Sequence, residues 1–196
     1  TATIVTATQG RMTDARQQLT AGQRLLSTLG LETLVNVERF VAGWLLSLEG
    51  DLAGAHRLFE AQGLPRMRRD AEDHTLAWAL AIDGDILRRR GDLVGARARL
   101  GEAIEIRTRL AQRTQLAEAK LSLAQLLLDE GGTAEAAEAA SALVPELWAM
   151  DARDTAALAQ VLLAQTQLQR GDRSQARRTA DAALTRVSAT QSPRVR

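Results

Sequence analysis

The stretch 91–96 reads Gly91-Asp92-Leu93-Val94-Gly95-Ala96, and its Gly-x-x-x-x-Ala pattern recurs at five nearly evenly spaced positions of the 196-residue chain. The intervals between the copies are 40, 41, 40 and 40 residues, and the copies begin at Gly10, Gly50, Gly91, Gly131 and Gly171. Self-similarity at such a period is typical of solenoids, in which each repeat is one supersecondary unit that stacks on its neighbours. The motif therefore predicts a repeat array.

The composition indicates that the repeats are helical. Hydrophobic residues make up 45% of the chain, but aromatic residues only 3%, and there are three prolines and no tyrosine. The core must therefore consist mainly of leucine and alanine, both strong helix formers. A net charge of +1 argues against binding of nucleic acid through the overall field, and without cysteine there is no disulfide or cysteine metal site.

The sequence also bears on location and source. The longest apolar run, Leu76–Ile82, is too short to span a bilayer, so we expect a cytoplasmic protein without a membrane segment. Lys120 is the only lysine among 25 basic residues, which suggests a GC-rich bacterial genome. Only nine residues precede Gly10 where later repeats have about 20, so we expect the chain to be a fragment of a longer solenoid.

Each repeat reads as helix A, a turn at the glycine, and helix B. We expect helix A of the third repeat at about Asp73–Arg90 and that of the fourth at about Gln115–Glu130, because apolar residues recur there at helical spacing. Glycine ends helix A in a left-handed conformation at low cost. Caps for helix B are predicted from the residues that follow the glycines: Asp51, Asp92 and Asp172, with Thr13 and Thr133 in the other two repeats.

Small residues recur on both helices of each pair. The motif alanines fall in the first turns of helix B, and another small residue precedes each of the last four turn glycines by seven positions: Gly43, Gly84, Ala124 and Ala164. Small residues on both sides of a crossing let the two helix axes approach at the short end of the usual range.

This order of small residue, turn glycine, apolar residue and alanine resembles the tetratricopeptide repeat family, as in Gly84…Gly91-Asp92-Leu93…Ala96…Leu100…Ala103. The resemblance covers nearly the whole chain, although the family's usual period is about 34 residues and its aromatic residues are largely replaced here by leucine and alanine. The general sequence character of the repeats is also similar to that of long-repeat arrays appended to bacterial Ser/Thr protein kinases and transcription regulators.

Two prolines interrupt the helical pattern. Gly63-Leu64-Pro65 is expected to end helix B of the second repeat after about Ala61 and to leave 65–70 as a connection or a single turn. Pro145 is expected to kink or restart helix B of the fourth repeat near Leu143.

No sequence motif for catalysis or cofactor binding is present. His56 and His74 fall on different predicted elements, which favours surface or structural roles over a metal pair. Asp83-Gly84-Asp85 is similar to the start of a calcium loop, but Val94 stands where the loop requires glutamate. We therefore expect no enzyme activity, no metal and no cofactor.

Arginines cluster in two places, Arg66, Arg68 and Arg69 in the linker and Arg88, Arg89 and Arg90 at the end of a helix. Such cations complement a helix C-terminus, or they form an anionic-ligand patch. Trp44, Trp78 and Trp148 either fill the core or face a groove. In tetratricopeptide arrays helix A lines the concave face, and this resemblance implies these groove candidates: Phe40, Trp44, Trp78, Asp85, Arg88, Arg89, Gln125, Asp129, Gln165 and Gln169.

The sequence therefore predicts an all-α superhelix of about nine stacked helices, forming a single repeat domain over 1–196. The resemblance implies a non-enzymatic module of a bacterial signalling or regulatory protein that binds a peptide, another protein or another domain of its parent. The alternative is a small-molecule sensor within a transcription regulator. The sequence leaves open the identity of the partner and the oligomeric state.

Overall fold

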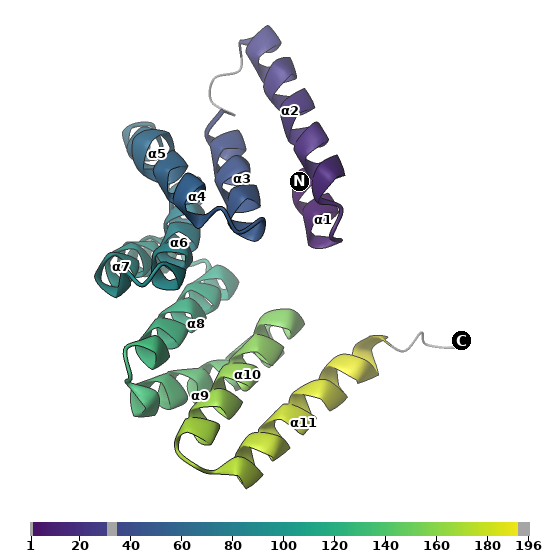
Figure 1. Ribbon diagram of the computed structural model, residues 1–196, viewed down its shortest axis with the longest axis vertical. Coiled ribbons are helices and arrows are strands. Elements are labelled where there is room, and N and C mark those ends of the chain that lie inside the picture. Colours follow the sequence, from purple (N-terminus) through teal and green to yellow (C-terminus); the bar gives the residue numbers. More distant parts are fainter. Residues whose placement is uncertain (1, 31–34, 192–196) are drawn as a thin grey trace. The chain divides into compact units, whose positions relative to one another are not determined.

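The computed structural model describes residues 2–30 and 35–191, and its regular structure over those residues is entirely helical (Figure 1). Within these described ranges it has ten helical rods where about nine are predicted, because the residues before Gly10 form a short helix of their own. The elements are α1 (Ala2–Thr8), α2 (Met12–Leu29), α3 (Val35–Leu48), α4 (Leu52–Leu58), the π-helical segment η2 (Phe59–Gly63), α5 (Leu64–Arg69), α6 (Asp73–Arg89), α7 (Leu93–Arg109), α8 (Arg113–Asp129), α9 (Thr133–Ala149), α10 (Arg153–Gln169) and α11 (Arg173–Gln191).

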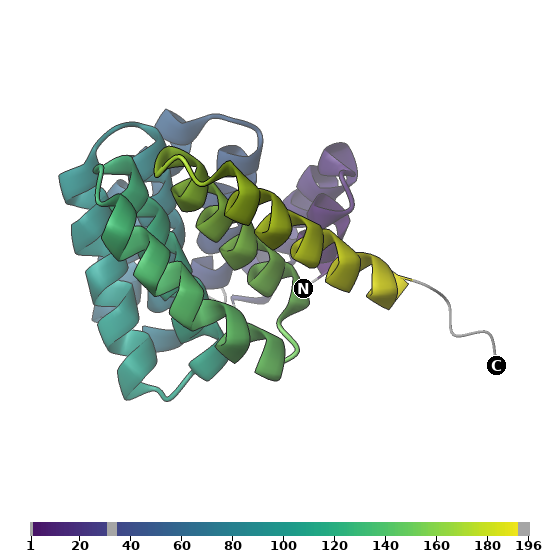
Figure 2. The same cartoon turned by 90° about the horizontal axis from the view of Figure 1, so that it is seen from below.

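The helices pack as antiparallel pairs within two compact units, Thr1–Ile106 and Arg107–Arg196. In the first unit α3 contacts α4 of its own pair and the neighbouring A helices α1 and α6. In the second unit α10 packs against both α9 and α11 and also contacts α8 (Figures 1 and 2). The predicted order of A and B helices is therefore confirmed.

Every predicted turn glycine has a positive φ, between 78° and 88°. At Gly91 the φ is +84°, and a Cβ placed there would meet nothing within 4 Å, so glycine is required for its backbone conformation rather than for space. The amide of Asp92 donates to the carbonyl of Leu87 at 3.0 Å, which closes the end of α6 as a Schellman motif.

The turns from helix B to the next helix A have the same geometry without always having glycine. Positive φ values near 55° occur at Ala71, Ala111 and Asp151, and Gly30 has a φ of +64°. The amide of Gln112 donates to Arg107 at 3.0 Å, as in the glycine turns. A left-handed residue other than glycine costs about 1–2 kcal/mol, and here it is offset by the closed hydrogen bonds.

The three aspartate caps are confirmed. The carboxylates of Asp51, Asp92 and Asp172 each accept a hydrogen bond from the backbone amide three residues on, at 2.8–2.9 Å. The two threonine caps are wrong. Helix α2 follows Arg11 and α9 follows Gly132 without a side-chain cap, because Thr13 and Thr133 lie inside the first turn, one position or more beyond the capping site.

Neither proline ends its helix, so the expected end after about Ala61 and the expected restart near Leu143 are corrected, while a kink at Pro145 stays a prediction. The backbone stays helical through 52–69, because η2 widens one turn: the amide of Leu64 donates to Phe59, five residues back. The wider turn accommodates Pro65, which lacks a donor and would otherwise clash with the preceding turn. Pro145 lies on the exposed side of a continuous α9, while the flanking Leu143 and Leu147 are buried in the core.

The small residues pack where predicted, and their contact partners are now defined. All five motif alanines are at most 3% exposed. A Cβ on Gly84 would lie 2.8 Å from Cγ of Leu100 and 3.4 Å from the carbonyl oxygen of Ala96, and a Cβ on Gly43 would lie 2.6 Å from the Phe59 ring. Each glycine of helix A therefore receives a large side chain of helix B directly against its backbone.

Because Ala96 is fully buried at this crossing, Ala96→Leu should overpack it and lower the free energy of unfolding by about 1–3 kcal/mol. Val94→Leu is the matched control, since Val94 belongs to the same helical turn but is 83% exposed; its effect should stay within about 0.5 kcal/mol. Denaturant unfolding measures both. Equal midpoints for the two variants would contradict the close packing of this turn.

Candidate functional site

The α3–α6 surface holds the predicted aromatic residues, but they differ in accessibility. Phe40 is 5% exposed and belongs to the core, so it cannot offer its ring to a partner, and its place among the groove candidates is corrected. Trp78 stacks on Phe40 with ring centroids 5.4 Å apart and contacts His74 at 5.2 Å on its other side. Trp44 and Trp78 pack on the core while remaining partly exposed.

Asp85, Arg88 and Arg89 form an ionic group at the end of α6. Arg88 donates to Asp85 from Nε at 3.1 Å and from Nη2 at 2.8 Å. Arg89 donates to the carbonyl oxygen of Ser47 at 3.4 Å, near the end of α3. Arg89 therefore complements the dipole of the neighbouring A helix. The side chains are 18% exposed for Arg88 and 39% for Arg89, so both can still reach solvent.

The linker arginines also have structural partners. Arg68 forms two hydrogen bonds to the carboxylate of Glu102, at 3.1 and 2.6 Å, and so ties α5 to α7. Arg66 lies 3.3 Å from Asp70 on its own helix. The contact of Arg68 therefore gives the cluster a role in packing the second repeat against the third.

In the second unit, α8 and α10 form a depression of about 380 Å³ whose walls include four predicted groove residues: Gln125, Asp129, Gln165 and Gln169. Leu128 and Leu168 supply its apolar part. Gln125 donates to Asp129 at 3.3 Å, and Thr133 donates to Gln169 at 3.0 Å. The depression therefore presents amide and carboxylate groups beside apolar surface.

Sequence reasoning missed an apolar stripe on α10. Leu158, Val161 and Leu168 are 60%, 46% and 54% exposed, and with Gln165 they occupy positions of one helix face. Their spacing of three and seven residues fits one helix face. The sequence did not distinguish this face from the others, because α10 is apolar on several sides. Trp148, by contrast, packs on the core and donates from Nε1 to buried Gln160 at 3.2 Å.

A buried polar cluster joins α4, α6 and α7. Asp83 is 0% exposed; it lies 2.8 Å from Nδ1 of His56 and accepts from Nε of Arg99 at 3.1 Å. Burial raises the pKa of Asp83, and the hydrogen bond from His56 opposes that shift. His56, Asp83 and Glu60 could together hold a metal ion. Arg99, however, is paired with both carboxylates, so its guanidinium already supplies the positive charge.

Over residues 2–30 and 35–191, no helix combines the length and apolar character needed to cross a membrane.

Comparison with known proteins identifies the fold. No protein-family model matches the chain, and no curated protein sequence does. A solved structure from Podosopora anserina, described as a kinesin light chain with nearly identical TPR-like repeats, matches with a TM-score of 0.65 and 14% identity, covering 98% of this chain and 94% of that chain. Its Q17M variant matches with a TM-score of 0.68 and 14% identity, covering 97% and 93%. The fold is therefore a TPR-like array of helix pairs.

The buried cluster predicts a large difference between two nearby aspartates. Asp83→Ala should lower the free energy of unfolding by about 3 kcal/mol, because Arg99 and His56 would lose their buried partner. Asp85→Ala removes a carboxylate that is 40% exposed and should cost about 1 kcal/mol or less. Urea unfolding distinguishes them. Comparable losses from both variants would show that the cluster does not stabilise the fold.

Proposed function

We propose that this TPR-like array is a non-enzymatic interaction module that binds a peptide, or another domain of its parent, on the exposed surfaces of its A helices. Helical repeat arrays generally use such extended surfaces for protein binding. The observation that carries the proposal is the depression between α8 and α10, where four of the predicted residues meet an exposed leucine, Leu168.

The chemistry of the α8–α10 depression suits a peptide. Gln125, Gln165 and Gln169 carry amides that can both donate and accept, as a peptide backbone requires. Leu168 and the stripe of Leu158 and Val161 offer apolar contacts for side chains of the bound segment. An amphipathic helix that docks in a groove uses this combination of spaced apolar anchors and a polar rim.

The α3–α6 surface supports a second contact area. Trp44 and Trp78 expose part of their ring surface, and Arg88 and Arg89 lie at the end of the same A helix as Trp78. Forked cations near flat apolar rings favour a segment that carries both acidic and apolar side chains. Asp85 holds Arg88 in place in the free protein, so an acidic partner must compete with this contact.

We also propose the cellular setting. The strong preference for arginine over lysine suits a bacterial source, and the resemblance to arrays of kinases and transcription regulators suits a signalling or regulatory protein in the cytoplasm. In this proposal both units belong to one repeat domain, and the array recruits a partner without acting on it chemically.

The test uses peptides selected from a random display library for binding to the unmodified protein. Leu168→Asp should weaken peptides that dock on the α8–α10 depression by about 2 kcal/mol, a roughly 30-fold increase in Kd by calorimetry, because a charge would replace a central apolar contact. Peptides that carry acidic residues should instead lose affinity when Arg88→Ala and Arg89→Ala are combined.

Leu184→Asp is the matched control for Leu168→Asp, since Leu184 is 66% exposed but lies on α11, a B helix. It should leave the affinity unchanged. If the selected peptides respond to Leu184→Asp and to none of the A-helix variants, binding occurs on the B helices and the proposed surfaces are wrong.

A further inference from the structure

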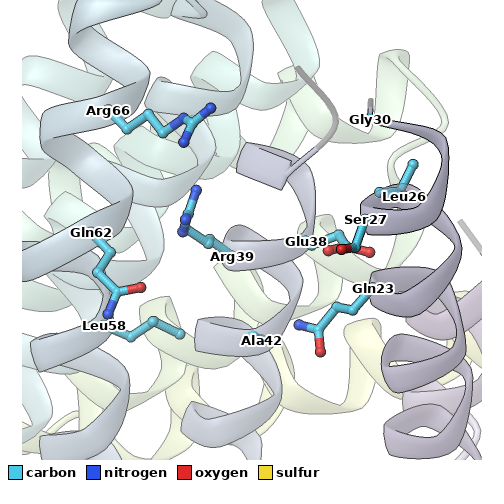
Figure 3. A pocket seen from close by; sticks show the side chains of 10 residues that line it. All are labelled: Gln23, Leu26, Ser27, Gly30, Glu38, Arg39, Ala42, Leu58, Gln62 and Arg66. Carbon is cyan, nitrogen blue, oxygen red and sulfur yellow. The ribbon is translucent and has the colours of Figure 1, made fainter. Parts of the chain in front are cut away.

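A pocket of about 520 Å³ lies in the first unit between α2, α3 and the rod formed by α4, η2 and α5 (Figure 3). Its volume is within the usual range for small-molecule sites, about 300–1,000 Å³. Three residues give it its charge: Arg39 and Glu38 from α3 and Arg66 from α5. Amide, hydroxyl and apolar groups complete the wall: Gln23, Leu26, Ser27, Gly30, Ala42, Leu58 and Gln62.

Arg39 indicates that the pocket accepts an anion. Its Nη1 is buried and has no hydrogen-bond partner among the described residues. A buried unpaired donor is costly to the folded protein. Figure 3 shows the guanidinium groups of Arg39 and Arg66 facing each other across one part of the pocket. In this arrangement each guanidinium can receive a carboxylate of a ligand in the pocket.

Glu38 lines the pocket on the side of α2 (Figure 3). Its side chain lies toward α2, where a Cβ on Gly22 would be 3.4 Å from its Oε1. Burial raises the pKa of Glu38, while the charge of Arg39 acts in the opposite direction. A cationic group placed beside Glu38 would offset the cost of burying its negative charge.

The π-helical segment shapes one wall of this pocket. Leu58, Gln62 and Arg66 are spaced by four residues and all line the cavity. In a regular α-helix such positions drift steadily around the axis, because one turn takes 3.6 residues. The wider turn of η2 rotates the rod in the opposite sense and keeps all three side chains on the pocket side (Figure 3).

We propose that this pocket is a binding site for a small amino dicarboxylic acid, whose two carboxylates face Arg39 and Arg66 and whose ammonium group faces Glu38. The pocket has two guanidinium groups and one carboxylate, and such a ligand has two carboxylates and one ammonium group. The charges are therefore equal in number and opposite in sign. A guanidinium has five donors, so Arg66 can keep its contact with Asp70 and still donate to the ligand. The site is independent of the proposed peptide surfaces, since it uses other residues.

Calorimetric titration with L-glutamate, glutarate and L-glutamine tests each charge of the ligand separately. L-glutamate should bind with a Kd of about 1 mM or tighter. Glutarate lacks the ammonium and L-glutamine lacks one carboxylate, so each should bind about tenfold more weakly. Glu38→Gln should remove the preference for L-glutamate over glutarate.

Arg39→Gln should weaken L-glutamate binding about tenfold or more, yet leave the thermal midpoint unchanged or raised, because it removes a buried unpaired donor. Arg57→Gln, at an exposed arginine next to the lining residue Leu58, is the control and should leave binding unchanged. Absence of binding by L-glutamate to the folded wild-type protein, or equal affinities for Arg39→Gln and the wild type, would overturn the proposal.

Discussion

The close crossing of the two helices in each pair is the constraint on which the other features depend. At Gly84 the side chain of Leu100 occupies the place that a Cβ would need, and at Gly43 the ring of Phe59 does the same. The close approach of helices A and B determines which residues of helix A face helix B and which do not. On the A helices α3 and α6, Trp78 then lies partly exposed and stacks on the buried Phe40.

Most features set by neighbouring residues were predictable from the sequence, with the caps at Thr13 and Thr133 as exceptions, whereas those set by distant contacts were not. The glycine turns and the caps at Asp51, Asp92 and Asp172 depend on a few adjacent residues, and they were predicted correctly. The uninterrupted rod around Pro65 was not, because it depends on burial of Leu64 and Met67 against other helices. Local proline chemistry alone predicts a break there.

The same distinction applies to the candidate sites. The resemblance to tetratricopeptide arrays selected Gln125, Asp129, Gln165 and Gln169, which the structure brings together between α8 and α10; whether a partner binds there remains a prediction. The pocket around Arg39 could not be predicted, since its walls come from α2, α3, α4 and α5 and from a π-helical turn that has no local sequence signature. Phe40 was misplaced because a resemblance that assigns helix A to the concave face does not reveal how deeply one of its residues is buried.

The spacing of left-handed residues has a consequence for how such a chain can change during evolution. Positive φ occurs at 10, 30, 50, 71, 91, 111, 131, 151 and 171, so the smallest recurring segment is one helix with one reversal. Duplication or loss of two such segments adds or removes one complete helix pair. Every remaining reversal then keeps the backbone hydrogen bonds that close it. An insertion of a single residue inside a helix would rotate all later side chains about its axis by about 100°. Length variation should therefore accumulate in whole helix pairs or within the reversals.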